Sequence, residues 1–147
     1  MKILNYFLYV YDKKDYLLYT RARLLLIFQL ILFFAVVIVQ FSMLFVGWED
    51  FIKTLFITPL IFFGMLLGMV VLKKGRYGAA SKLVISICSI AIIGGLIREP
   101  FMNPEYALSS YIFFVYPCLA LCVIFSSVKF LAVISAAFVA TDVALFM

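Results

Sequence analysis

Long runs of apolar residues, separated by short polar connections, dominate this chain. Residues 24–46 form the first run and contain no charged side chain, and further runs occupy about 55–72, 80–97, 107–125 and 130–147. At about 1.5 Å of rise per residue, a helix of about 20 residues crosses the roughly 30 Å hydrocarbon core of a bilayer. The runs lack the alternation of apolar and polar residues that marks barrel strands. The pattern therefore predicts an all-α fold, a polytopic transmembrane helix bundle with five spans.

The composition agrees with a chain that is embedded in lipid. Of the 147 residues, 68% are hydrophobic and 13% are charged, and the mean hydropathy is +1.24. Soluble domains have about 45–50% apolar and about 25% charged residues. A soluble core of this size cannot bury so many apolar side chains, which excludes an ordinary soluble domain and a disordered chain. The expected partner is the lipid bilayer, and nucleic acid is not expected.

The basic residues indicate how the chain is oriented. Ten of the twelve Lys and Arg residues precede the first span or lie in the second and fourth connections, whereas the first and third connections hold only Lys53 and Arg98. Cytoplasmic connections carry the excess of Lys and Arg in membrane proteins. We therefore expect a multi-pass protein of the bacterial inner membrane with a cytoplasmic N-terminus.

Residues 1–23 precede the first span and form a segment of their own in this prediction, followed by the transmembrane domain 24–147. The segment contains five tyrosines, which are Tyr6, Tyr9, Tyr11, Tyr16 and Tyr19. Aromatic rings and lysines are typical of a helix that lies at the level of the lipid headgroups, near anionic lipid. A plain juxtamembrane leader without a partner is the alternative.

Asp142 is the sharpest candidate for a functional residue. It lies near the middle of the fifth span, where an ionisable group costs about 2.5–3.5 kcal/mol and normally faces protein or a cavity. One interpretation is a ligand-binding or proton-binding carboxyl group. The others are a structural group, paired with Thr141, Ser135 or a glutamine of the first span, and a helix register that moves Asp142 to the outer interface.

Gln29, Gln40 and Arg98 complete the candidate ligand-binding set. The two glutamines are separated by about three helical turns and share one face of the first span. Each amide needs a hydrogen-bond partner when its helix is surrounded by lipid. We favour packing against other helices, with ligand binding as the alternative. Arg98 lies at the outer mouth, either on the rim of a ligand cup or in a solvated loop.

Gly64 and Gly68 form a GxxxG motif in the second span. Such small residues let another helix approach closely, either a neighbour in the same chain or a homodimer partner. The chain has no histidine, and Cys88, Cys118 and Cys122 lie within apolar runs, where apolar packing is the simplest interpretation. We find no catalytic motif, so we expect no enzyme, no metal site and no cofactor.

The layout resembles the N-terminal multi-helix membrane region of bacterial receptors of the methyl-accepting chemotaxis or membrane-bound nucleotide cyclase type. The matching features are the leader, the basic turn Lys73-Lys74-Gly75-Arg76-Tyr77, the turn Ser126-Ser127-Val128-Lys129 and the ending of the last span around Ala140-Thr141-Asp142. The resemblance implies a dimeric sensory or anchoring module for signal transduction. It would relay helix movement to a cytoplasmic output domain absent from this chain. The apolar ending at Met147 favours a chain that contains the first five of six spans. The alternative is a small complete membrane protein, either a transporter or channel subunit or an assembly partner in a membrane complex.

Overall fold

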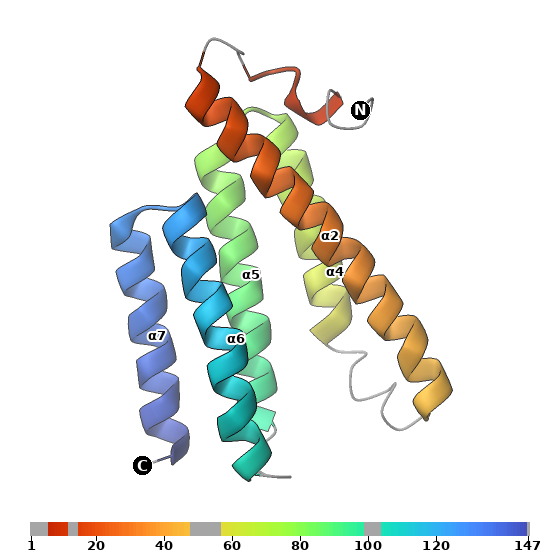
Figure 1. Cartoon of the computed structure of the whole chain (residues 1–147), viewed down its shortest axis with the longest axis vertical. Coiled ribbons are helices and arrows are strands. Elements are labelled where there is room, and N and C mark those ends of the chain that lie inside the picture. Colours follow the sequence, from red (N-terminus) through yellow and green to blue (C-terminus); the bar gives the residue numbers. More distant parts are fainter. Residues whose placement is uncertain (1–5, 12–14, 48–56, 99–103, 147) are drawn as a thin grey trace. The chain divides into compact units, whose positions relative to one another are not determined.

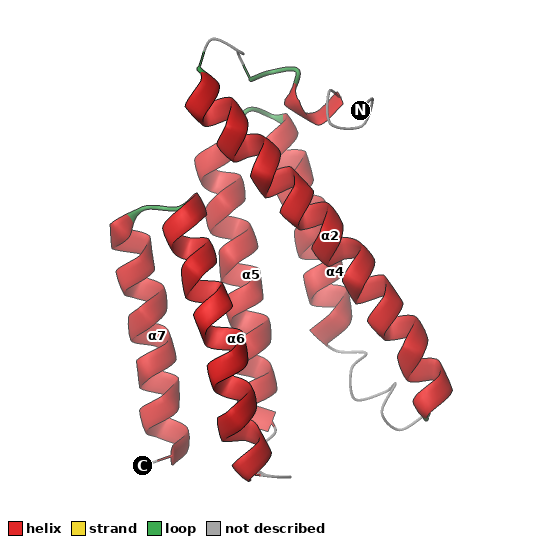
Figure 2. Cartoon of the chain, in the orientation of Figure 1, coloured by secondary structure: helices red, strands yellow, loops and turns green. Residues whose placement is uncertain are grey.

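The computed structural model of the chain is built from long helices (Figures 1 and 2). It describes residues 6–11, 15–47, 57–98 and 104–146, and these contain no strand. The helices are α2 (Tyr16–Val46), α4 (Ile57–Lys73), α5 (Tyr77–Arg98), α6 (Pro104–Phe125) and α7 (Val128–Phe146). The predicted all-α class is confirmed, and each predicted span coincides with most of one helix.

The helix ends are set by polar residues outside the apolar runs. Oδ1 of Asp15 accepts a hydrogen bond from the backbone N–H of Leu18 at 3.2 Å, so Asp15 caps α2. As a result α2 begins at Tyr16, and its first turns belong to the segment 1–23 that the sequence groups with the leader. Ser127 caps α7 in the same way, since the N–H of Phe130 donates to its Oγ at 3.4 Å.

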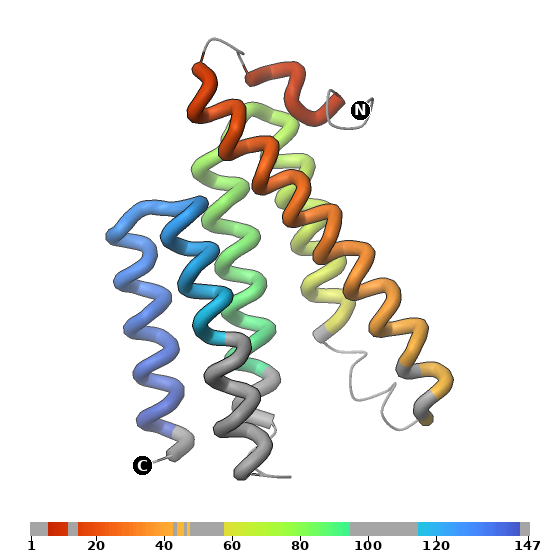
Figure 3. Tube along the Cα trace, viewed as in Figure 1, coloured from red at the N-terminus to blue at the C-terminus, as the bar shows by residue number. Residues whose placement is uncertain are grey.

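Helix α4 ends in a tight turn that leads into α5 (Figure 3). The backbone N–H of Gly75 donates to the carbonyl of Leu72 at 2.9 Å, and that of Arg76 donates to the carbonyl of Val71 at 3.4 Å. This is the pattern of a Schellman cap, in which the residue after the helix adopts a left-handed conformation. Gly75 has φ = +78°, which a residue with a side chain rarely adopts. We call Lys73–Arg76 the basic turn.

The chain divides into two compact units, and the boundary lies within α5, between Val84 and Ile85. In the first unit α2 packs against α4. The rings of Phe33 and Phe62 join these two helices, with centroids 4.7 Å apart. The N-terminal segment, Tyr6–Tyr11, and the first turns of α5 belong to the same unit.

In the second unit α6 packs against α7, and Ser89 joins α5 to α6. Ser89 Oγ lies 2.9 Å from the carbonyl of Ile85 and 3.3 Å from Sγ of Cys118. Since the hydroxyl proton of Ser89 is donated to the carbonyl, the thiol of Cys118 is the donor in the second contact. Both side chains are buried, so the pair satisfies a polar group inside an apolar unit.

Two helical stretches in the described part of the chain are long and apolar enough to cross a membrane. They are Tyr16–Ser42, with 27 residues, and Tyr77–Gly94, with 18 residues. Thr58–Lys73 and Val115–Phe125 are shorter apolar helices. Length and composition alone therefore give two candidate spans.

Candidate functional site

A buried amide on α2 is the most unusual polar group of the first unit. Gln29 has 0% of its surface exposed, and neither its Oε1 nor its Nε2 has a hydrogen-bond partner among the described residues. A primary amide offers two donor hydrogens and an acceptor oxygen. Leaving a buried polar group unpaired costs about 1–3 kcal/mol. Such a group marks a place where the protein holds a polar function at the expense of stability.

Gly68 makes the space that the Gln29 side chain occupies. A Cβ atom at position 68 would overlap the amide nitrogen of Gln29 and would stand 2.8 Å from Cγ2 of Val84 on α5. Gly64, one turn earlier on α4, is buried as well. Gly68 of the GxxxG motif therefore lets α2 and the first turns of α5 approach α4 within a single chain.

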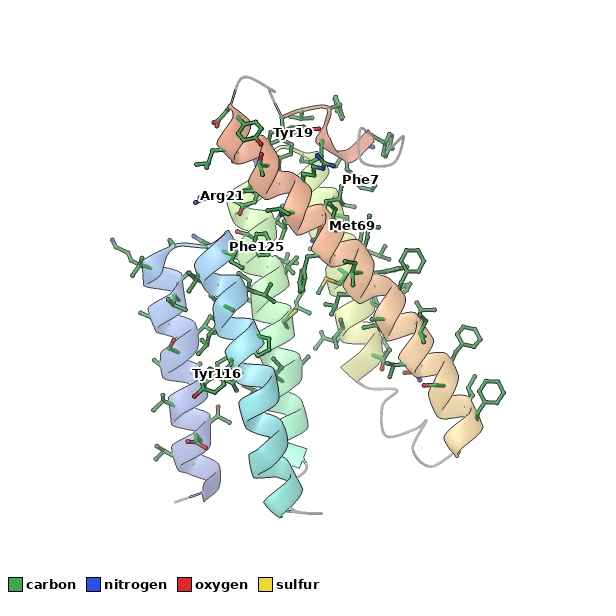
Figure 4. The ribbon with its side chains drawn as sticks, in the orientation of Figure 1. Phe7, Tyr19, Arg21, Met69, Tyr116 and Phe125 are labelled. Atoms are coloured by element: carbon green, nitrogen blue, oxygen red, sulfur yellow. The ribbon has the colours of Figure 1, made fainter. Side chains whose placement is uncertain are left out.

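Buried apolar side chains precede Gln29 on α2 and flank Gly68 on α4. Leu25 and Leu26 on α2 are fully buried, as is Met65 on α4, and Met69 on α4 is 6% exposed. Figure 4 marks Met69 on the α2–α4 pair. The flexible thioether chains of methionine adapt to changes in their surroundings. The side chains that are buried near this position on α2 and α4 are therefore apolar, and two of them are flexible methionines.

Gln40 carries a second amide whose Oε1 and Nε2 are buried without a hydrogen-bond partner in the described part of the chain. It lies three turns beyond Gln29, on the same face of α2. Because Phe33 faces Phe62 and Gln29 faces Gly68, the two helices are antiparallel. This register places Gln40 level with the start of α4, where the preceding residues lie outside the described ones.

The remaining candidates from the sequence lie in the second unit. Asp142 is half-buried on α7. The hydroxyl of Thr141 donates to the carbonyl of Ala137 at 2.8 Å, so its proton is not donated to Asp142. Arg98 is the last residue of α5, and its side chain lies outside the described residues. The structure therefore brings together Gln29 and Gly68, whereas Asp142 belongs to the other unit.

A second set of contacts was not predicted from the sequence: the N-terminal segment packs on the basic turn. The hydroxyl of Tyr11 donates to the carbonyl of Leu72 at 2.9 Å. Lys73 Nζ donates to the Tyr6 hydroxyl and lies 3.7 Å from the centroid of its ring. The one signal in the sequence is the density of tyrosines before the first span. These contacts fasten the leader to the end of α4.

Among the polar side chains in these contacts, Tyr11 is the best buried, with 6% of its surface exposed. Burial raises the pKa of Tyr11 to about 12, and the neighbouring Tyr77 contributes to the rise. The phenol is therefore protonated at neutral pH and remains a hydrogen-bond donor. Its acceptor, the carbonyl of Leu72, also accepts the bond from Gly75, so two donors satisfy one carbonyl at the end of α4.

The described residues contain no group of three or more His, Cys, Asp or Glu side chains that could hold a metal ion. Cys88, Cys118 and Cys122 are free thiols. The described residues define an all-α protein with two helices of membrane-spanning length, a buried amide without a hydrogen-bond partner between α2 and α4, and a leader that contacts a basic turn. No protein-family model, curated protein or solved structure matches the chain.

Proposed function

We propose that this chain is a membrane-embedded sensory or anchoring module of a bacterial signal-transduction receptor. In this proposal all five long helices cross the inner membrane, and the N-terminus lies in the cytoplasm. The module relays movement of its helices to a cytoplasmic output domain that the chain itself does not contain.

The observation that carries the membrane part of the proposal is the outward-facing apolar surface of the helices. Five large side chains of α2 are each at least 60% exposed, namely Ile31, Phe34, Ile38, Phe41 and Phe45. In the most apolar stretch of this helix, only 17% of the residues are buried. The core helix of a soluble protein is mostly buried, so lipid is the natural solvent for this surface.

The same surface continues on other helices. Phe63 on α4 is 67% exposed, and Val133 and Val139 on α7 are 63% and 62% exposed. The apolar stretch Val115–Phe125 is shorter, but α6 as a whole has 22 residues, from Pro104 to Phe125. These exposed faces support a helix bundle in lipid, and the distribution of Lys and Arg supports its orientation.

The contacts of the first unit support the receptor part of the proposal. Receptors transmit signals through elements that have two arrangements of similar energy. The unpaired amide of Gln29 makes the present packing of α2 on α4 less favourable, and the contact of Tyr11 with Leu72 joins that helix pair to the leader. Movement at the α2–α4 interface would therefore reach the cytoplasmic end.

Cysteine labelling tests the orientation. Single cysteines replace Lys74 or Glu49 in a variant that lacks the natural cysteines, and intact cells are treated with a membrane-impermeant maleimide. We expect labelling at position 49 in intact cells and at position 74 only after lysis. Labelling of position 74 in intact cells would contradict the proposed topology, and extraction of the protein by alkaline carbonate would contradict membrane embedding.

The receptor is distinguished from a small membrane protein by the native polypeptide. An antibody against the leader detects the protein in its own membranes. A polypeptide well above 16.8 kDa that carries a soluble signalling domain supports the receptor. A polypeptide of about 16.8 kDa that copurifies with other membrane proteins contradicts the receptor. It supports a transporter or channel subunit, or an assembly partner.

A further inference from the structure

Basic side chains gather at the end of the first unit where α2 begins and α4 meets α5. Exposed cations there are Arg21, Arg23, Lys74, Arg76 and Lys82. None of them has an ion-pair partner among the described residues. Figure 4 shows Arg21 and Tyr19 on the first turns of α2 and Phe7 in the leader. We call the five basic side chains Arg21, Arg23, Lys74, Arg76 and Lys82 the cationic end.

The acidic residue that the structure describes at this end is Asp15, and its Oδ1 already accepts the capping bond from Leu18. The first turns of α2 and α5 both lie here, and the N-terminal end of a helix carries a partial positive charge. Arg76, directly before α5, therefore adds a cation where the helix dipole favours an anion. Among the described residues, this end therefore carries much more positive than negative charge.

The backbone at the start of α5 is accessible. Gly78 is exposed, and no atom lies within 4 Å of the place where its Cβ would stand. The first N–H groups of a helix bind phosphate oxygens in many proteins, although here those of Ala79 and Ala80 donate to the carbonyl of Arg76. An anionic group that approaches Arg76 would therefore reach both the guanidinium and the helix start.

The neighbouring side chains are typical of a site at the edge of a bilayer. Tyr9 and Tyr16 are 73% and 76% exposed, and Leu17 and Leu24 on α2 are exposed as well. Tyrosine concentrates at membrane–water interfaces, where the ring meets apolar chains and the hydroxyl meets headgroups. These apolar and aromatic neighbours would not contribute to the binding of a soluble anion.

We propose that the cationic end is a binding site for the headgroup phosphate of anionic phospholipid, centred on Lys74 and Arg76 of the basic turn. The proposal rests on the proposed function, because it needs the chain in a membrane. The contacts of Tyr6 and Tyr11 with Lys73 and Leu72 hold the basic turn in place, so the cations are presented from a fixed backbone. Arginine and lysine near an anionic surface each strengthen binding roughly fivefold.

The test is a titration of the purified full chain in neutral detergent with phosphatidylglycerol or phosphatidylcholine, followed by native mass spectrometry. We expect the wild type to prefer phosphatidylglycerol. The double variant Lys74→Gln/Arg76→Gln should lose about 25-fold in affinity for phosphatidylglycerol, from two contributions of roughly fivefold. Its affinity for phosphatidylcholine should not change.

Lys129→Gln is the matched control, because Lys129 is also exposed but lies in the second unit, at the start of α7. We expect it to bind phosphatidylglycerol as the wild type does. Equal affinities of the wild type and the double variant overturn the proposal, and so does an equal loss in Lys129→Gln, which would indicate a response to net charge. Circular dichroism of each variant shows whether its helices are retained, and Arg76→Lys, which keeps the charge, should retain most of the affinity.

The outcomes separate this site from the proposed function. The titration uses detergent micelles, so it does not depend on the orientation of the chain in cells. If position 74 is cytoplasmic and phosphatidylglycerol is not preferred, the lipid site fails and the membrane module stands. If phosphatidylglycerol is preferred and position 74 is labelled from outside, the topology fails and the lipid site stands.

Discussion

Replacing Gly68 by alanine tests the packing of α2 on α4 directly. The new Cβ would overlap the amide nitrogen of Gln29 and would lie 2.8 Å from Cγ2 of Val84. The amide lies at the end of a flexible side chain, but Gln29 is fully buried, so moving the amide requires neighbouring side chains to shift as well. Valine is branched at Cβ and has few rotamers, so Val84 yields little.

Two terms set the size of the effect. Overpacking a well-packed site costs about 1–3 kcal/mol. Glycine to alanine in a helix interior gains about 1 kcal/mol from helix propensity. We therefore expect Gly68→Ala to lower the free energy of unfolding by about 0–2 kcal/mol.

Gly94→Ala is the matched control, because no atom lies within 4 Å of the Cβ that it adds to α5. This control should show the propensity gain alone, so the difference between the two variants isolates the packing cost. The measurement is unfolding in detergent, followed by circular dichroism. If Gly68→Ala stabilises the protein as much as Gly94→Ala does, the close approach at Gly68 is refuted.

A double-mutant cycle identifies the partner. Gln29→Ala removes the amide that the new Cβ meets, so the cost of Gly68→Ala should fall in the Gln29→Ala background. Residues in contact show coupling energies of about 0.5–3 kcal/mol. Additive effects would show that Gln29 does not occupy the space above Gly68.

Three further variants probe single hydrogen bonds and the unpaired amide, each by unfolding in detergent. Tyr11→Phe removes the hydrogen bond to Leu72 and should lower the free energy of unfolding by about 1 kcal/mol. Because folding raises the pKa of Tyr11 from 10.0 to about 12, this contribution is complete below pH 10 and is lost as the pH rises toward 12. The difference in stability between variant and wild type should therefore shrink over that pH range. Ser127→Ala removes the cap of α7 and should cost about 1 kcal/mol, whereas Ser127→Asp should restore it. Gln29→Leu replaces an unpaired amide by an apolar side chain of similar size and should stabilise the protein by about 1 kcal/mol; a loss of stability would show that the amide has a partner.

The helices could be predicted from the sequence because apolar runs of this length have one stable backbone arrangement in lipid. Their ends were less certain, because a terminus depends on one capping residue and not on hydropathy. Because Asp15 caps α2, the helix begins at Tyr16, although the apolar run begins at residue 24. Gly75 was visible as a turn residue in the basic sequence, and its left-handed backbone closes α4 as the turn requires.

The tertiary contacts could not be predicted in this way. Tyr11 and Leu72 are 61 residues apart, and nothing in a single sequence pairs a particular tyrosine with a particular backbone carbonyl. The glutamines and the GxxxG glycines were both recognised, but as separate features. Their relation depends on the register of α2 against α4, which the structure supplies through Phe33 and Phe62.

The same register places the two contact sites of the first unit one helical turn apart on α4, so we expect them to influence one another. Tyr11 holds the end of α4 at Leu72, and Gln29 lies against Gly68, one helical turn away along the same helix. A helix is stiff over one turn, so a shift of α4 against α2 that gives the Gln29 amide a partner would also displace the carbonyl that Tyr11 binds. In the proposed receptor, the buried Gln29 amide and the leader are therefore linked through α4, and Gln29→Leu should alter the hydrogen exchange of the leader as well as the stability of the helix pair.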